Sequence, residues 1–343
     1  MKKVWKISIA AMIMTMLLGM TAYAGSWQES FRGKWWKNDD GSYPTSGWHW
    51  IDCKNDGTAE CYYFDENGYV LVNTTTPDGY KVNENGEWIV EEIVGEKVKQ
   101  RVQQQKVEIQ GSVSYVQEND SSLKIGTMVS PGCRNWNFYL HTPKNLTDNM
   151  PMIVLLHGGK MGEGAFSILK EECIFQYMLA NEKISENAII IYPQYVYENH
   201  NTSSYADVTH DIARIAQLVA RDYKVDMNRI YVTGGSKGGN GTIFMCKDYP
   251  ELFACGVSIT GISGPGPRLK DFMKATEVPL WMIIEDTSSA VEASQKVEKG
   301  IKENGGTVWL TVDTGADHAS TAGFNSGVDK FGVYDWMLTQ KKN

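Results

Sequence analysis

Short apolar runs that alternate with amphipathic segments constrain the fold of residues 150–312 more than any other feature of the sequence. The runs cover residues 152–156, 188–192, 230–232, 256–259, 280–284 and 308–312, and residues 165–180, 207–223, 239–248 and 290–304 between them have helical spacing. Such alternation predicts an α/β fold with a mostly parallel sheet covered by helices on both faces. Because ligands of such sheets bind at the carboxyl ends of the strands, we expect the functional site there.

Residues 25–90 have a different composition. They hold six of the 11 tryptophans, and Asn-Gly or Asp-Gly pairs recur between short aromatic segments such as Tyr62-Tyr63-Phe64. These pairs favour hairpin turns, so a small all-β module of hairpins is predicted over 25–90. The charged, glutamine-rich residues 91–117, with sparse valines, are predicted to be a linker, partly helical, and residues 118–343 the α/β domain.

The first residues are typical of a secretory signal peptide. Three lysines at positions 2, 3 and 6 precede an apolar run over 7–20, which ends in the small-residue pattern Ala22-Tyr23-Ala24. We therefore predict that residues 1–24 are a signal peptide and that the protein is secreted. No stretch reaches the roughly 20 apolar residues that span a bilayer, so the mature chain is not expected to be transmembrane.

Charge and cysteine spacing exclude several kinds of partner. Acidic side chains outnumber basic ones by 41 to 33, a net charge of −8, which gives no reason to expect nucleic acid. Neither the six cysteines nor the histidines have metal-ligand spacing, so no metal and no cofactor are expected. Cys53 and Cys61 flank a turn-rich segment and are predicted to form a disulfide, while pairing among the other four, at 133, 173, 246 and 255, stays open.

Ser236 lies in the motif Gly234-Gly235-Ser236-Lys237-Gly238, between a predicted strand and a predicted helix. A serine on such a sharp turn exposes its hydroxyl at the end of the sheet, and the glycines let neighbouring backbone pass close by. The pentapeptide alone is weak evidence, but the flanking strand and helix favour a nucleophile elbow. Ser236 is the candidate nucleophile.

A serine nucleophile needs a base and an acid after it in the chain. His318 follows the last predicted strand and is the histidine that comes after Ser236, so it is the candidate base. Glu285 and Asp286 both follow the strand over 280–284, and Asp286 is preferred because it stands farther into the loop. Asp313 and Asp317 lie too near His318 in the sequence.

His157-Gly158-Gly159-Lys160 closes the strand over 152–156. Glycines there let backbone N–H groups approach a developing oxyanion, although a tight strand-to-helix turn requires the same residues. We expect the oxyanion hole to use the amide of Gly159 in this loop and the amide of Lys237, next after the nucleophile.

These motifs resemble the esterase branch of the α/β-hydrolases that includes polyhydroxybutyrate-depolymerase-like and feruloyl-esterase-like enzymes. The resemblance covers residues 122–338 and is carried by the approach to Ser236 over 223–234 and by Tyr249-Pro250-Glu251-Leu252-Phe253 after it. It implies the α/β-hydrolase fold and an ester substrate. The family's spacing between its acid and the next helix matches Asp286.

Gly47-Trp48-His49-Trp50 and the segment 62–69 resemble the choline-binding, or cell-wall-binding, repeats of bacterial surface proteins. That resemblance implies aromatic cages for a quaternary ammonium, with Trp48, Trp50, Tyr62 and Tyr63 as candidate ligand-binding residues. Cell-wall choline or polysaccharide is the implied partner, and cell-wall association the implied location. The alternative is that these aromatic side chains only hold the hairpins together.

The function expected from the sequence is a secreted serine hydrolase that cleaves carboxylic esters through a Ser-His-Asp triad and an acyl-enzyme. Two alternatives stay open. A peptidase of the same fold would use the same groups, and a non-catalytic surface-binding protein would keep the fold as a scaffold.

Overall fold

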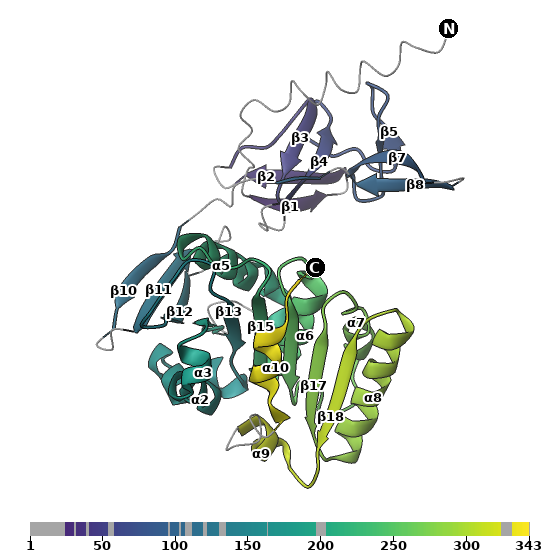
Figure 1. The fold of residues 1–343 in the computed structure, drawn as a ribbon. Coiled ribbons are helices and arrows are strands. Elements are labelled where there is room, and N and C mark those ends of the chain that lie inside the picture. Colours follow the sequence, from purple (N-terminus) through teal and green to yellow (C-terminus); the bar gives the residue numbers. More distant parts are fainter. Residues whose placement is uncertain are drawn as a thin grey trace. The chain divides into compact units, whose positions relative to one another are not determined.

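The protein forms two compact units, Met1–Gly111 and Ser112–Asn343, in the computed structural model (Figure 1). The structure describes residues 25–30, 32–38, 41–53, 58–94, 97–102, 104–106, 112–118, 122–129, 135–162, 164–196, 204–323 and 331–342. The predicted signal peptide, residues 1–24, lies outside the described residues. Within these ranges, no helix has the length and apolar character needed to cross a membrane.

The first unit consists of short antiparallel strands in three sheets. The sheets are β1-β2, β3-β4-β9 and β5-β6-β7-β8. The strands are β1 (Gly25–Ser30), β2 (Gly33–Asn38), β3 (Gly47–Ile51), β4 (Thr58–Phe64), β5 (Thr74–Thr75), β6 (Lys81–Val82), β7 (Trp88–Val94), β8 (Lys97–Val102) and β9 (Gln104–Lys106). The expected small all-β hairpin module is confirmed.

Four of the predicted turns share one backbone geometry. Gly41, Gly68, Gly79 and Gly86 have φ values of 86°, 83°, 92° and 88°, and each amide donates to the carbonyl oxygen three residues earlier. Such positive φ angles favour glycine over any side chain with a Cβ. The recurrence of this turn is the structural counterpart of the repeated Asn-Gly and Asp-Gly pairs.

The segment expected to be a linker, residues 91–117, instead contains strands. The end of β7 pairs with β8, with Ile89 opposite Val102 and Ile93 opposite Val98, and β9 pairs with β4. Sparse valines among charged residues predicted a partly helical linker, but a spacing of four, as between Val94, Val98 and Val102, also fits a strand. Whether such a segment forms a helix or a strand depends on the strand with which it pairs, and the local pattern does not reveal that partner.

The predicted disulfide between Cys53 and Cys61 is not present, because both residues remain as thiols. The register of β3 and β4 places Cys61 opposite Trp50, while Cys53 lies beyond the end of β3. Cys61 packs in a cluster with Trp50 and Ala59, whereas Cys53 packs against the cluster of Ile51 and its neighbours. Successive side chains of a strand point to opposite faces, so the two thiols lie on different sides of the hairpin.

The second unit contains a nine-stranded sheet in the order β10-β11-β12-β14-β13-β15-β16-β17-β18. Its strands are β10 (Ser114–Gln117), β11 (Leu123–Val129), β12 (Asn135–His141), β13 (Met152–Leu156), β14 (Ile189–Pro193), β15 (Ile230–Gly235), β16 (Cys255–Ile259), β17 (Leu280–Glu285) and β18 (Val308–Asp313). From β14 to β18 the strands are parallel. This confirms the predicted sheet, and β10 to β12 add an antiparallel edge that the sequence analysis did not assign.

Helices cover both faces of this sheet. They are α2 (Cys173–Ala180), α3 (Glu182–Ser185), α5 (Thr209–Asp222), α6 (Lys237–Asp248), α7 (Leu269–Phe272), α8 (Ser288–Glu303), α9 (His318–Gly323) and α10 (Val333–Thr339), with 3-10 turns η1 (Gly159–Gly162), η2 (Phe166–Glu171) and η3 (Tyr205–Asp207). α2 and α10 pack on one face, and α5, α6 and α8 lie over the other (Figure 1).

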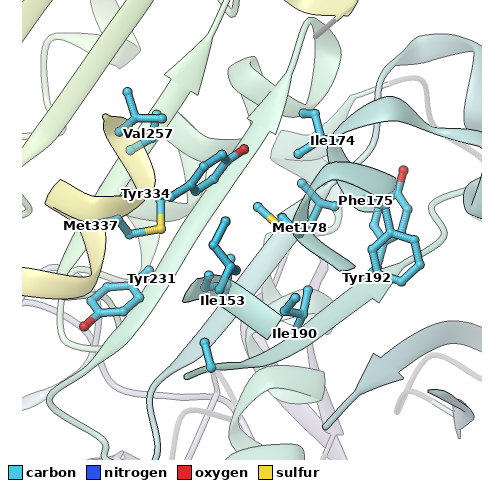
Figure 2. Packing of buried hydrophobic residues seen from close by; sticks show 14 of the residues in the cluster. Ile153, Ile174, Phe175, Met178, Ile190, Tyr192, Tyr231, Val257, Tyr334 and Met337 are labelled. Carbon is cyan, nitrogen blue, oxygen red and sulfur yellow. The ribbon is translucent and has the colours of Figure 1, made fainter. Parts of the chain in front are cut away.

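Figure 2 shows the core beneath α2 and α10. Phe175 and Met178 of α2 and Tyr334 of α10 pack against Ile153 and Tyr231 of the central strands, and all five are at most 1% exposed. Burial of such side chains contributes about 1.5–3 kcal/mol each, so this layer fixes the central strands and the loops at their carboxyl ends.

The predicted helix over 165–180 is divided into η2 and α2 by Glu172. Glu172 adopts an extended conformation, with φ −71° and ψ 127°, and its side chain is buried. Helical periodicity in the sequence does not reveal this break, because the break depends on a contact between the Glu172 carboxylate and the loop after β13.

Candidate active site

Ser236 lies on a strained turn between β15 and α6. Its φ of 54° and ψ of −116° are unusual for a residue with a Cβ, and such conformations cost about 1–3 kcal/mol. The surrounding structure holds the turn: Ser236 N donates to Ile259 O of β16 at 2.8 Å. The strand, sharp turn and helix have the arrangement expected of a nucleophile elbow.

The glycines of the motif allow this turn to pack. A Cβ at Gly234 or at Gly238 would collide with the carbonyl oxygen of Leu156 at the end of β13. Close packing of β13 and α6 around the turn therefore excludes side chains at both positions.

His318 reaches Ser236 from the loop after β18. His318 begins α9, and its Nε2 lies 2.9 Å from Ser236 Oγ. The histidine side chain is 44% exposed, so the pair opens to solvent. The structure thus brings together the predicted nucleophile and the predicted base.

The carboxylate beside His318 is Glu285, not the expected Asp286. Glu285 Oε1 lies 3.2 Å from His318 Nδ1, and Glu285 is 2% exposed. Asp286 instead accepts a hydrogen bond from Gly315 N at 2.9 Å, and its own amide donates to Ala316 O. Alternation explains the difference: Glu285 ends β17 and points inward, and the next side chain points to the surface.

His157 organises the loop after β13. Tyr195 N donates to His157 Nε2 at 2.8 Å, so this nitrogen is an acceptor and the ring proton is on Nδ1, 2.7 Å from Gly158 O. Tyr205 Oη also donates to His157 O, at 3.1 Å. These contacts fix the backbone that carries Gly158 and Gly159.

Glu172, which the sequence analysis did not single out, binds this loop from within the protein. Its Oε1 accepts a hydrogen bond from Gly158 N at 3.2 Å, and among the described residues Oε2 has no hydrogen-bond partner. Burial raises the pKa of the Glu172 carboxyl to about 7, against the lowering effect of the Gly158 N–H. The Gly158 N–H is therefore engaged within the protein.

A polar pocket of about 270 Å³ lies over Ser236 and His318. Hydroxyl, amide and cationic side chains form most of its wall, with the residues Ser204, Tyr205, Ser236, Lys237, Asn240, Thr260, Gly261, Ser263, Arg268 and His318. Lys237 begins α6, where the first amides point out of the helix N-terminus. The pocket therefore contains the predicted nucleophile, base and one predicted oxyanion-hole residue.

No cluster of three or more potential metal-binding His, Cys, Asp or Glu side chains occurs in the part of the chain that the structure describes. The buried thiols Cys246 and Cys255 both have raised pKa values, chiefly because of desolvation. A thiol with a raised pKa is a poor nucleophile, so these cysteines are packing residues.

The first unit contains an aromatic cluster that includes two of the four aromatic residues predicted to bind a ligand. Trp48 contacts Tyr63, Tyr80 and Trp88, with ring centroids 5.2, 6.0 and 5.5 Å away, and all four rings are half-buried. Trp48 Nε1 also donates to Asp78 Oδ2 at 2.8 Å. We call these four rings the aromatic cluster.

The other two predicted ligand-binding residues are core residues. Trp50 is 9% exposed and Tyr62 is 3% exposed, and Tyr62 packs in a separate cluster with Phe64 and Trp36. Tyr80 and Trp88 were not predicted to bind a ligand, although Tyr80 directly follows an Asp-Gly pair, as Tyr69 follows Asn67-Gly68, and Trp88 lies two residues after Gly86. An aromatic residue shortly after each turn was the available signal.

Two known families match parts of the chain. Residues 194–284 match the prolyl oligopeptidase family, and residues 50–88 match the choline-binding repeat. Each match covers less than half of the chain.

Curated relatives are esterases by name. The chain is 28% identical over 165 residues to acetylxylan esterase A of Aspergillus ficuum, covering 44% of this chain and 50% of the relative. It is 30% identical over 137 residues to acetylxylan esterase A of Emericella nidulans, covering 37% and 43%. The chain therefore spans about half the length of the curated relatives that it matches.

A solved thermostable esterase has a similar structure, with a TM-score of 0.53 and 18% identity over 77% of this chain and 70% of that chain. This similarity establishes the fold. The expected α/β-hydrolase fold, and the expected resemblances to esterases of that fold and to choline-binding repeats, are confirmed.

Proposed function

We propose that the second unit is a serine esterase that hydrolyses carboxylic esters through Ser236, His318 and Glu285. The observation that carries the proposal is the hydrogen-bonded chain from Ser236 Oγ to His318 Nε2 at 2.9 Å and from His318 Nδ1 to Glu285 Oε1 at 3.2 Å. The acid in this chain order is Asp or Glu in α/β-hydrolases, so a glutamate fits.

In the proposed reaction, His318 Nε2 takes the proton from Ser236 Oγ as the oxygen attacks the acyl carbon. The ester carbonyl becomes a tetrahedral oxyanion, and His318 then gives the proton to the leaving alkoxide, which departs as the alcohol. A water molecule attacks the resulting acyl-serine in the same way and releases the carboxylic acid. Glu285 holds the imidazole with its proton on Nδ1 and stabilises the imidazolium.

We assign the oxyanion contacts to the amides of Gly159 and Lys237. The engagement of Gly158 N–H by Glu172 and the position of Lys237 at the start of α6 support this assignment. A preorganised hydrogen-bond donor of this kind raises kcat by a factor of about 10²–10³.

The pocket supports a short acyl group and a polar alcohol. Its volume of about 270 Å³ and its hydroxyl and amide walls suit an acetyl ester of a hydroxylated molecule better than a long-chain ester. The curated relatives, named for acetylxylan, agree with this choice.

The test is turnover of 4-nitrophenyl acetate together with labelling by a fluorophosphonate. We expect label on Ser236, and loss of both label and turnover in Ser236→Ala. An unlabelled, inactive wild-type protein would instead support a non-catalytic surface protein. A prolyl-peptide anilide tests the peptidase alternative, because the prolyl oligopeptidase match includes Ser236; cleavage of the anilide without ester turnover would contradict the esterase.

We also propose that the aromatic cluster of the first unit binds a quaternary ammonium such as choline. The half-buried rings of Trp48, Tyr63, Tyr80 and Trp88 lie together and offer exposed aromatic faces to a cation, and the exposed Asp78 carboxylate beside Trp48 adds attraction. The match of residues 50–88 to the choline-binding repeat supports this site. With export through residues 1–24, choline binding would hold the esterase at a cell wall that carries choline.

Choline titration followed by calorimetry tests this second proposal. Trp48→Ala and Trp88→Ala should each weaken binding by about tenfold or more, because each removes one face of the cage. Trp309→Ala is the matched control, since Trp309 is an exposed tryptophan of the second unit. Equal weakening by all three substitutions would exclude the aromatic cluster as the site.

A further inference from the structure

We infer that Arg268 selects ester substrates that carry a carboxylate close to the scissile ester. This inference rests on the proposed esterase function and extends it to a substrate class. It is carried by the position of Arg268 in the wall of the Ser236 pocket and by the charges around it.

The guanidinium of Arg268 has no ion-pair partner among the described residues. Arg221 and Arg229 of the same unit pair with Asp222 and Asp226, at 2.9 and 2.8 Å. Arg268, by contrast, forms no salt bridge to any described carboxylate, and the pocket wall contains no Asp or Glu. A cation is therefore left at the site in a chain whose net charge is −8.

Arg268 is nevertheless held in place. Its Cζ lies 5.7 Å from the ring centroid of Phe244 on α6, and Phe244 packs edge-on against Phe272 of α7 at 5.1 Å. Both phenylalanines are buried. Stacking on an aromatic ring orients the guanidinium without using its N–H donors, which leaves them for a ligand.

Carboxylate is the chemistry that best fits these features. The planar guanidinium presents parallel N–H donors that match the two oxygens of a carboxylate. Nearby hydroxyl groups of Ser263 and Thr260 line the same pocket and suit a polar substrate. Because Arg268 is exposed, we expect kcat/KM to favour the carboxylate substrate by about tenfold, which is less than a buried ion pair would give.

Two matched pairs of substrates test the inference. 4-Acetoxybenzoate and its methyl ester differ by a carboxylate on the leaving group, and 4-nitrophenyl hydrogen glutarate and 4-nitrophenyl butyrate differ by one on the acyl side. In at least one pair, wild-type kcat/KM should favour the acid, and Arg268→Gln should lower kcat/KM for the acid about tenfold while changing the neutral ester less than about twofold.

Lys270→Gln is the matched control, because it removes the same charge from an exposed position two residues away that does not line the pocket. It should preserve the preference, and Arg268→Lys should keep part of it. The inference is overturned if Arg268→Gln changes acid and neutral substrates by the same factor in both pairs, or if Lys270→Gln has the same effect as Arg268→Gln.

Binding separates this inference from the proposed function. In the Ser236→Ala protein, 4-hydroxybenzoate should bind more tightly than its methyl ester, and Arg268→Gln should abolish the difference. Failure of the esterase would appear as absence of turnover on every neutral ester, whereas failure of the Arg268 inference would appear as equal binding of these two ligands.

Discussion

Glu285 and Asp286 are adjacent carboxylates with different contacts, and substitution by the corresponding amide distinguishes their roles. Glu285→Gln should lower kcat for an aryl acetate by about 10³–10⁴-fold, because the amide can donate to Nδ1 and favour the wrong tautomer of His318. Asp286→Asn should stay within about threefold, since the amide oxygen still accepts from Gly315 N.

Steady-state kinetics of the two variants, with circular dichroism to verify folding, checks this prediction. The reverse order, with Asp286→Asn inactive and Glu285→Gln active, would show that the histidine uses Asp286 during the reaction.

The raised pKa of Glu172 gives a second prediction at the residue scale. Between the ordinary value of 4.5 and the folded value of about 7, the folded protein binds more protons at this group than the unfolded chain does. The free energy of unfolding therefore falls as the pH rises through this window, by up to about 3 kcal/mol. Glu172→Gln removes this pH-dependent loss of stability, because glutamine does not ionise. Its amide oxygen still accepts a hydrogen bond from Gly158 N.

Glu172→Gln should therefore be more stable than wild type at pH 8, and the difference should shrink towards pH 4.5. Urea unfolding at several pH values measures it. A stability difference that does not change with pH would mean that the pKa of Glu172 is the same in the folded and unfolded states, and so is not raised by folding.

At the level of individual elements, the structural features that depend on local sequence could be predicted from local patterns. The strand runs, the elbow around Ser236 and the glycine turns of the first unit were predictable, because short buried strands and positive φ angles leave a direct trace in the sequence. The choice of Glu285 over Asp286 depends on where β17 ends, and a shift of one residue reverses which side chain points inward. Likewise, β8 could be recognised only with its partner β7 in view.

The packing of β13 against α6 gives a prediction at this scale. Gly238→Ala should lower the free energy of unfolding by about 2–3 kcal/mol, because the new methyl group meets the carbonyl of Leu156. Gly266→Ala is the control, since a Cβ there meets no atom within 4 Å. Midpoints of urea unfolding compare the two, and equal midpoints would mean that the elbow accommodates a Cβ.

At the scale of the whole molecule, the division into two units could be foreseen from composition, but its boundary could not. Tryptophan-rich hairpins contrast with the later strand-helix alternation, which reveals two domains. The predicted boundary near residue 90 was too early, because β9 (Gln104–Lys106) adds a strand to the sheet of β3 and β4, a long-range pairing. The aromatic cluster could not be foreseen for the same reason: its rings come from separate hairpins, and local sequence does not show which hairpins lie together.

The two units should therefore separate after Gly111 without loss of the esterase. Among the described residues, Trp36 and Trp50 belong to hydrophobic clusters of the first unit, and Ile153 and Tyr231 to the core of the second. Ser236, Glu285 and His318 all lie in the second unit. A fragment of residues 112–343 should keep kcat/KM for 4-nitrophenyl acetate within about twofold, because its core and its site are complete.

The complementary fragment, residues 25–111, should bind choline resin and have no esterase activity, whereas residues 112–343 should pass through the resin. Elution of the full chain by free choline measures retention, and circular dichroism shows that each fragment is folded. A folded fragment of residues 112–343 without turnover would mean that the hairpin unit contributes to the active site. Retention of that fragment on choline resin would place the choline site outside the aromatic cluster.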